Sequence, residues 1–260
     1  MLKIFPHEGH PEQRWFSPVD SKGQYHSEDS VFVENIFPYY ISSVEKAIQT
    51  NDWKEADELL AAMKLFQKKF GGELYPPAFK TKLEIIYNKT NILDGLSNIY
   101  GITGFLLLLF LFAGIFYTRL NLKIPVRIAI AVILLAFVSH TIALGIRWYI
   151  AGHAPWSNGY EALTYIAWAT VLAGILFSFR SPVTLSATAI LAFFILHTAH
   201  LSWMDPEITN LVPVLKSYWL VIHVAIITAS YGFLGMGALL AAINILIMFY
   251  KLKKLKLILI

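Results

Sequence analysis

The sequence predicts an all-α fold: a polytopic helical membrane protein with about five transmembrane helices and a small N-terminal helical lobe. Three observations predict it. Of the 260 residues, 57% are hydrophobic, and the mean hydropathy is +0.57, which is more apolar than an ordinary soluble domain. Five apolar runs are each long enough to cross the bilayer. Fourteen of the 17 acidic residues precede residue 96. We therefore expect a soluble helical extracytoplasmic segment over residues 1–95 and a transmembrane domain over residues 96–260.

Composition and motifs exclude several classes of function. The chain has no cysteine, which excludes a disulfide framework, a CxxC redox pair and a thiolate metal site. The net charge of +4 comes mostly from the last residues and informs topology, so we expect no nucleic-acid partner. We find no Gly-rich phosphate loop, no GxSxG and no HExxH motif. The spans carry no charged residue at mid-membrane, which argues against an ion-coupled transporter.

The N-terminal segment predicts a small helical lobe. Residues 38–70 show apolar side chains at helical spacing in two runs, separated by "QTND". Asn51 or Asp52 can cap the second helix. A third helix is expected over about 80–87. The helix-turn-helix shape is similar to a single tetratricopeptide unit, but one unit is not an array.

The transmembrane domain follows from the five apolar runs, each near the roughly 20 helical residues that span about 30 Å of hydrocarbon. The third and fourth are separated only by "RSP" and predict a tight helical hairpin. The fifth has about 32 uncharged residues, or about 48 Å as a helix, so it must tilt or project beyond the membrane. The expected spans are about 99–117, 128–147, 162–179, 183–202 and 218–250.

Basic residues predict the orientation of the spans. The short loops on one side hold only Arg147 and Lys216. By the positive-inside rule, the loops 148–161 and 203–217 therefore face outside, the N-terminal lobe is also outside, and the C-terminus is cytoplasmic. The opposite side carries eight basic residues: Arg119, Lys123, Arg127, Arg180, Lys251, Lys253, Lys254 and Lys256.

The outside position of the lobe raises a question of export. A charged segment of about 95 residues does not easily cross a membrane unaided, and nothing before residue 99 is typical of a signal peptide. We therefore expect the chain to be part of a longer one with an upstream span. The basic final stretch "KLKKLKLILI" fits this expectation.

The most informative candidate residue is His223, in "KSYWLVIHVAI". Counting outward from the inner end of the fifth span places it at or above the outer interface. Trp219 is four residues earlier, on the same helical face. A neutral imidazole there can ligate a metal, including haem iron, and an indole can pack on a porphyrin plane. The alternative is an interfacial histidine beside an aromatic-belt tryptophan.

Four other histidines have functional and structural interpretations. His153, in the loop "RWYIAGHAPWSNGYEA", is an ordinary loop histidine on composition. His140 lies inside the second span, where it either has a role inside the bundle or hydrogen-bonds a Ser or Thr of a neighbouring helix. His197 and His200 are spaced i, i+3 and could share a metal. No third ligand accompanies them, so a structural pair is favoured.

Two motifs together carry a resemblance. "RWYIAGHAPWSNGYEALTYIAW" and, further on, "LVPVLKSYWLVIHVAIITASYGFLGMGALL" closely resemble the CcsA/ResC family, the haem-handling subunits of system II c-type cytochrome assembly. The resemblance covers about residues 124–247. The N-terminal lobe is similar, more weakly, to the soluble segment before this core in fused CcsB–CcsA-type synthases.

The resemblance implies a mechanism and a set of site residues. Haem b, as a transient substrate, crosses from the cytoplasm, is held at the outer face, and is joined through its vinyl groups to the CxxCH thiols of apocytochrome c. His223 matches the axial haem ligand of the family's "W-x-x-x-H-V" motif, with Trp219 beside it, and His153 matches the histidine of its "R-W-x-x-x-G-H-x-P" loop. Arg147, from its charge and location, could pair with a haem propionate. Trp156 and His140 complete the candidate haem-binding residues.

The departures from the family pattern limit what this chain can do alone. The tryptophan-rich "WGxxWxWDPKE" (WWD) signature and a second outer-face histidine are absent. We therefore expect a partial chain that contributes to haem–cytochrome c ligation, is not active alone, and works with a CcsB/ResB-type membrane partner or fused domain in a bacterial inner membrane. Two alternatives stay open: a transport or channel protein whose outer aromatics bind an apolar ligand, and a structural membrane subunit with incidental histidines.

Overall fold

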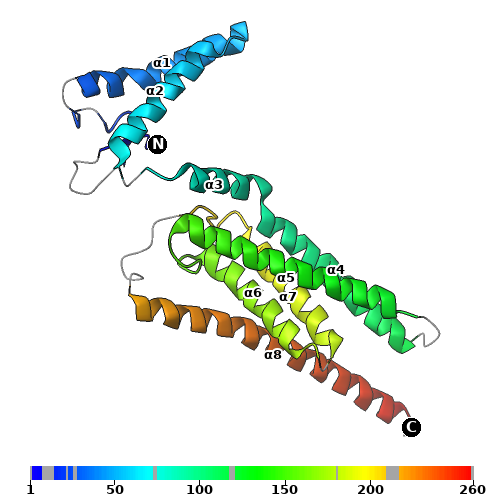
Figure 1. Cartoon of the computed structure of the whole chain (residues 1–260). Coiled ribbons are helices and arrows are strands. Elements are labelled where there is room, and N and C mark those ends of the chain that lie inside the picture. The colour runs from blue at the N-terminus through cyan, green and yellow to red at the C-terminus, as the bar shows by residue number, and fades with distance from the viewer. Residues whose placement is uncertain are drawn as a thin grey trace. The chain divides into compact units, whose positions relative to one another are not determined.

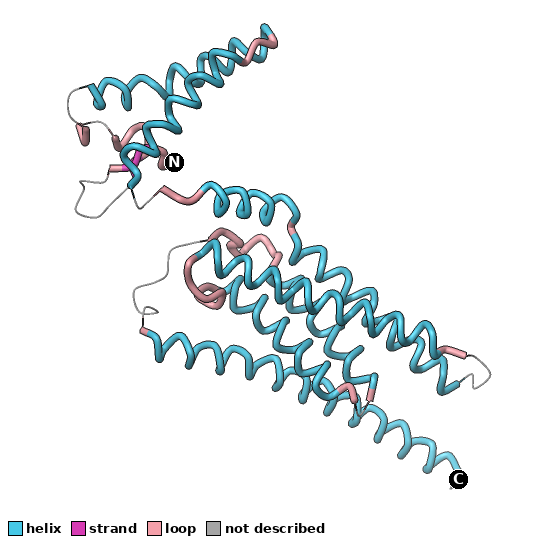
Figure 2. The backbone as a smooth tube through the Cα atoms, in the orientation of Figure 1, coloured by secondary structure: helices cyan, strands magenta, loops and turns pink. Residues whose placement is uncertain are grey.

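The computed structural model describes residues 2–7, 15–21, 23–25, 28–72, 75–116, 121–179, 181–208 and 217–258. The described chain is almost entirely helical (Figures 1 and 2), which confirms the predicted all-α class. It divides into two compact units, residues 1–81 and 82–260. The helices are α1 Glu28–Thr50, α2 Lys54–Gly71, α3 Ala78–Thr90, α4 Ile92–Phe116, α5 Lys123–Ala151, α6 Gly159–Phe177, α7 Pro182–Ala199 and α8 Tyr218–Ile258.

The first unit is a helical hairpin with a short strand pair. α1 packs on α2, and β1 (Phe5–Pro6) pairs antiparallel with β2 (Trp15–Phe16). Phe66 lies at the centre of the core, with the rings of Phe5, Tyr25 and Phe32 packed around it. The Tyr25 hydroxyl donates to the Pro6 carbonyl at 2.9 Å. Burial raises the pKa of Tyr25 to about 12, because the charged phenolate would lose its hydration.

The two predicted helices of the lobe are present, but the first begins earlier than expected. It starts at Glu28 and passes through Pro38, where the sequence argument placed its start. Proline lacks the N–H of an internal helical hydrogen bond and is usually tolerated in the first turn, so packing of the residues before it overrides that preference. At the second helix the Asp52 carboxylate accepts from the Lys54 N–H at 3.1 Å.

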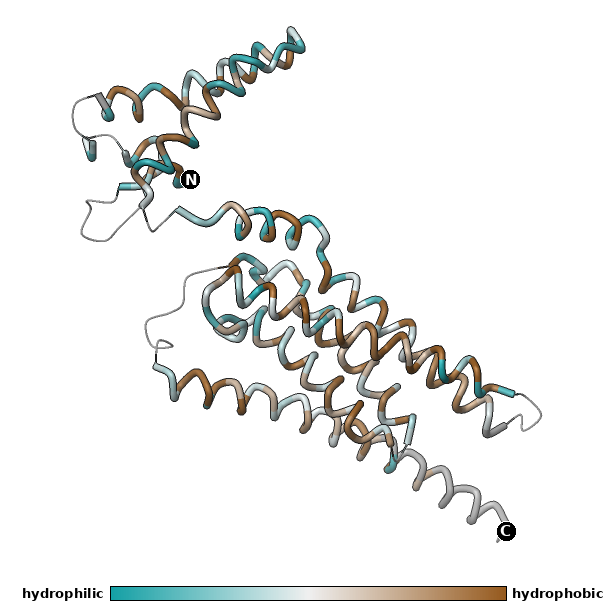
Figure 3. Tube along the Cα trace, viewed as in Figure 1, coloured by the Kyte–Doolittle hydropathy of each residue, from teal (hydrophilic) through white to brown (hydrophobic). Residues whose placement is uncertain are grey.

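Among its described residues, the second unit has five helices that are long and apolar enough to cross a membrane, by length and composition. α4 packs on α5 and α7, and α6 packs on α7 and α8. Figure 3 shows apolar residues along these helices. The predicted number of spans is thus confirmed, and α6 and α7 form the predicted hairpin. α8 has 41 residues, about 62 Å at 1.5 Å per residue, so it exceeds the thickness of the hydrocarbon core.

Small residues allow the helices of this bundle to approach closely. A Cβ added to Gly232 of α8 would lie 2.8 Å from the backbone nitrogen of Thr170 in α6. One added to Gly174 of α6 would lie 2.8 Å from the Cβ of Thr188 in α7. Helices in a membrane associate mainly by such close packing, because lipid supplies no hydrophobic drive between them. The glycines therefore fix how α8 and α7 lie against α6.

Candidate functional site

A buried ion pair stands at the end of the bundle where α5 ends and α6 begins. The Arg147 Nε donates to Glu161 Oε1 at 2.9 Å, and their side chains are 1% and 0% exposed. Two buried charges are stable only when they are paired and their remaining hydrogen-bonding groups are satisfied. The partners of each side chain therefore decide what this region can do.

Glu161 also hydrogen-bonds the loop between α5 and α6. Its Oε2 accepts from the Ser157 main-chain N–H at 2.9 Å and from the Ser157 hydroxyl at 2.6 Å. Asn158 caps α6 by accepting from the Glu161 N–H at 2.8 Å, as an N-cap asparagine does. Gly152 ends α5 with φ +75°, a conformation that favours glycine. Local sequence thus folds residues 152–158 around the carboxylate.

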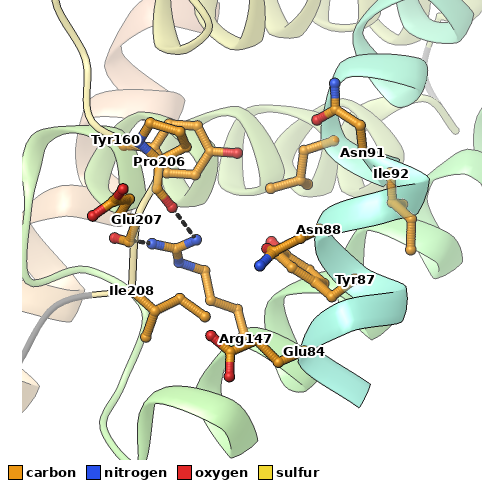
Figure 4. A pocket seen from close by; sticks show the side chains of 11 residues that line it. Glu84, Tyr87, Asn88, Asn91, Ile92, Arg147, Tyr160, Pro206, Glu207 and Ile208 are labelled. Carbon is orange, nitrogen blue, oxygen red and sulfur yellow. Dashed lines mark hydrogen bonds between the residues drawn. The ribbon is translucent and has the colours of Figure 1, made fainter. Parts of the chain in front are cut away.

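Arg147 also binds the loop that follows α7. Its two terminal nitrogens donate to the carbonyls of Pro206 and Glu207 at 2.9 and 3.2 Å (Figure 4). Its Cζ lies 5.0 Å from the centre of the Tyr160 ring, a cation–π distance. Three of the five guanidinium N–H groups are therefore bonded to protein. Pairing with a haem propionate remains a prediction, and it would have to use the other two.

A polar cavity of about 460 Å³ opens beside this guanidinium. Counting Glu84, Glu161 and Glu207 against Arg147 gives this region a formal charge of −2, which opposes an anionic ligand. Tyr87, 8% exposed, lines the cavity with its hydroxyl near Arg147 but without a hydrogen bond of good geometry. The lining residues, shown in Figure 4, are Glu84, Tyr87, Asn88, Asn91, Ile92, Leu93, Arg147, Tyr160, Pro206, Glu207 and Ile208.

Trp156 of the same loop and aromatic residues of α5 and α6 form a separate apolar surface. The Trp156 ring lies 5.8 Å from Trp148 and 4.9 Å from Tyr165, and Tyr165 stacks on Trp168 at 5.7 Å. They line an apolar cavity of about 230 Å³ together with Thr141, Leu144, Gly145 and Pro155. The half-buried His153 has its Nδ1 3.1 Å from the Ala154 carbonyl. The loop is therefore a packed structure with a polar and an aromatic side.

His223 and Trp219 lie elsewhere, near the start of α8, whose main contacts are with α6 and α7. Both side chains are exposed, Trp219 by 76%. The His223 imidazole hydrogen-bonds to none of the described residues. An exposed, unengaged imidazole beside an exposed indole is available to a ligand.

The remaining predicted histidines have other surroundings. His140 is fully buried, with its ring centre 6.0 Å from that of Tyr100. His200 has its Nδ1 2.7 Å from the Leu196 carbonyl and its ring against Tyr160. Within the described ranges, no three His, Cys, Asp or Glu side chains are grouped to hold a metal.

The structure thus places His153 and Trp156 in the loop after α5, Arg147 in the last turns of α5, His223 and Trp219 on α8, and His140 inside the bundle. Sequence reasoning missed Glu161, Tyr160 and Tyr87. A signal for Glu161 was present, since it is one of only three acidic residues after residue 96 and lies close to Arg147 in sequence. An isolated carboxylate at the start of an apolar helix calls for a cationic partner.

Comparison with known proteins places these features in a family. Residues 156–259 match the family described as cytochrome C assembly protein. The chain is 37% identical over 245 residues to the protein NrfI of Wolinella succinogenes, covering 93% of this chain and 26% of NrfI. It is 41% identical over 107 residues to the cytochrome c biogenesis protein CcsA of Prochlorococcus marinus strain MIT 9303, covering 39% of this chain and 33% of CcsA.

A third relative, the cytochrome c biogenesis protein CcsA of Guillardia theta, is 33% identical over 125 residues, which are 46% of this chain and 42% of that protein. The chain therefore spans less than half the length of each of these three relatives. The matched residues include Trp156, Glu161, Trp219 and His223. The chain belongs to the CcsA/ResC family of cytochrome c biogenesis proteins.

Proposed function

We propose that this chain handles haem in c-type cytochrome biogenesis, binding it at the outer membrane face through His223 for covalent attachment to apocytochrome c. The observation that carries the proposal is the exposed His223 imidazole near the start of α8, in a segment that matches the family. Neutral imidazole is a common axial ligand of haem iron. Trp219, one helical turn earlier, would offer an apolar plane for the porphyrin.

The attachment chemistry fits a protein that positions rather than reacts. A cysteine thiol of the apocytochrome adds across a haem vinyl group, so that sulfur bonds to one carbon and hydrogen to the other. This addition needs no net oxidant or reductant. The task left to the membrane protein is to hold the haem with its vinyl edge open to the CxxCH segment. An exposed imidazole near the start of a helix serves that purpose, because it binds the iron from one side.

The surroundings of the site are proposed to be those of a bacterial inner membrane. The distribution of basic residues supports a cytoplasmic C-terminus and an outer position for His223. We further propose that ligation requires a CcsB/ResB-type partner or fused domain, because one axial histidine leaves the second position of the iron open. The chain alone would bind haem and would not attach it to a CxxCH peptide.

The first test is an absorption spectrum of the full chain purified from haem-replete membranes, compared with the His223→Gly variant. The proposal expects a Soret band in the wild type that is lost or shifted in the variant and returns with added imidazole, since imidazole can replace the missing ligand. A wild-type Soret band that is unchanged in His223→Gly would overturn the role of His223. No haem in either protein would overturn haem binding by this chain.

A matched pair of variants tests whether the Trp219 indole contributes to haem binding. Trp219→Leu should raise the haem dissociation constant about 2- to 10-fold, as expected when an aromatic contact worth about 0.5–1.5 kcal/mol is lost. Tyr231→Leu is the control, since Tyr231 is also an exposed aromatic residue of α8 (54% against 76%) but lies about three turns further along the helix. Equal effects of both substitutions would contradict a specific packing role for Trp219.

A further inference from the structure

The interior of the second unit contains an imidazole that satisfies neither of its ring nitrogens. His140 of α5 is 0% exposed, and its ring centre lies 6.0 Å from that of Tyr100 in α4. It faces the main chain of Thr164 in α6 without a hydrogen bond of good geometry. Within the described part of the chain, neither His140 nitrogen nor the Tyr100 hydroxyl has a hydrogen-bond partner.

Neighbouring buried polar groups of this kind are the usual surroundings of an internal water molecule. Buried polar atoms in folded proteins are nearly always hydrogen-bonded, to protein or to water. A neutral imidazole offers one donor and one acceptor, and a tyrosine hydroxyl offers both. A water needs two to four polar partners, and His140 with Tyr100 supplies at least two. Inside a membrane domain, an imidazole without a hydrogen-bond partner costs free energy, and a bound water molecule would remove that cost.

Other polar groups connect this point with the outer cavity. Arg147 follows His140 by seven residues on α5, so both lie on one face about 10.5 Å apart. On α6, Glu161 and Thr164 are one turn apart and both are 0% exposed. Polar side chains therefore continue from the cavity beside Arg147 inward to His140. Tyr87, in the wall of that cavity, adds another buried hydroxyl, near Arg147.

We propose that His140 and Tyr100 bind internal water, and that this water exchanges with the polar cavity lined by Arg147 and Tyr87. The ligand of the site is water. The proposal goes beyond haem handling, because no haem contact enters it.

Hydroxyl-radical footprinting of the full chain in detergent tests the site. X-ray radiolysis makes radicals from water where it stands, so a buried side chain beside bound water is modified while a dry one is protected. Tyr25 is the matched control, since it is a buried tyrosine whose hydroxyl is bonded to the Pro6 carbonyl. We expect Tyr100 to be oxidised several-fold faster than Tyr25, although Tyr100 is the less exposed of the two. Equal or slower oxidation of Tyr100 would overturn the proposal.

Two further measurements separate the parts of the proposal. In His140→Leu, oxidation of Tyr100 should fall to the Tyr25 level while Tyr25 is unchanged, and an unchanged Tyr100 would overturn the role of His140. Should that variant not fold, the wild-type comparison decides alone. Mixing with H₂¹⁸O before exposure should place ¹⁸O in the Tyr100 product within the mixing time. Slow incorporation would refute exchange with the cavity.

Discussion

The most decisive perturbation of the structure is Glu161→Gln, which keeps the shape of the side chain and removes its charge. The two carboxylate oxygens accept from three donors: Arg147 Nε, the Ser157 N–H and the Ser157 hydroxyl. An amide has one oxygen, so its NH₂ group must face at least one of those donors. The Arg147 charge, 1% exposed, also loses its partner.

The expected cost follows from this geometry. Removing one partner of a buried ion pair costs about 3–5 kcal/mol of unfolding free energy, because the remaining charge is left buried and unpaired. Glu207→Gln is the matched control, since only the main-chain carbonyl of Glu207 bonds Arg147 and its exposed side chain pairs with none of the described residues. That substitution should stay within about 0.5 kcal/mol of the wild type.

The assay is reversible unfolding of the purified chain in mixed detergent and SDS, followed by loss of helical signal and of tryptophan fluorescence. The two units can unfold separately, so the free energy is taken from the transition reported by the tryptophans of the second unit. An effect of Glu161→Gln within 0.5 kcal/mol of the wild type, or equal to that of Glu207→Gln, would refute the reasoning. The double variant Arg147→Met with Glu161→Leu should recover part of the loss, because no unpaired charge remains.

Three further predictions concern packing, a cap and a titration. Gly232→Val should destabilise the second unit by about 1–3 kcal/mol by forcing α8 off Thr170, whereas Gly237→Val, where a Cβ meets nothing within 4 Å, should cost about 1 kcal/mol or less in the same unfolding assay. Asn158→Ala should cost about 1 kcal/mol through loss of the α6 N-cap. The first unit should lose stability between pH 10 and about 12, because the Tyr25 pKa is raised to about 12 in the folded state and its ionisation favours unfolding. Tyr25→Phe should weaken that pH dependence, and a stability that falls equally in the variant would contradict it.

The fold class could be predicted because it depends on properties that the chain carries locally. Runs of about 20 apolar residues can satisfy their backbone only as helices in a membrane, so each run indicates its own span. The start of α1 could not be predicted in the same way. Pro38 favours a helix start by its local chemistry, and only the packing of the preceding residues on α2 shows that the helix continues through it.

The candidate site likewise combines features that local sequence determines with features that depend on tertiary packing. By itself the sequence determined that His223 and Trp219 share one helical face, because four residues in a helix make about one turn. The cap at Asn158 and the glycine that ends α5 are also local features, because both depend on neighbouring residues, but neither was predicted. Only the tertiary structure decided that Arg147 binds Glu161 and the carbonyls of residues 206 and 207, and that His140 faces Tyr100. Those contacts join segments 14 to 60 residues apart. Which residue pairs with a buried charge depends on how distant segments pack, and the local sequence does not encode that packing.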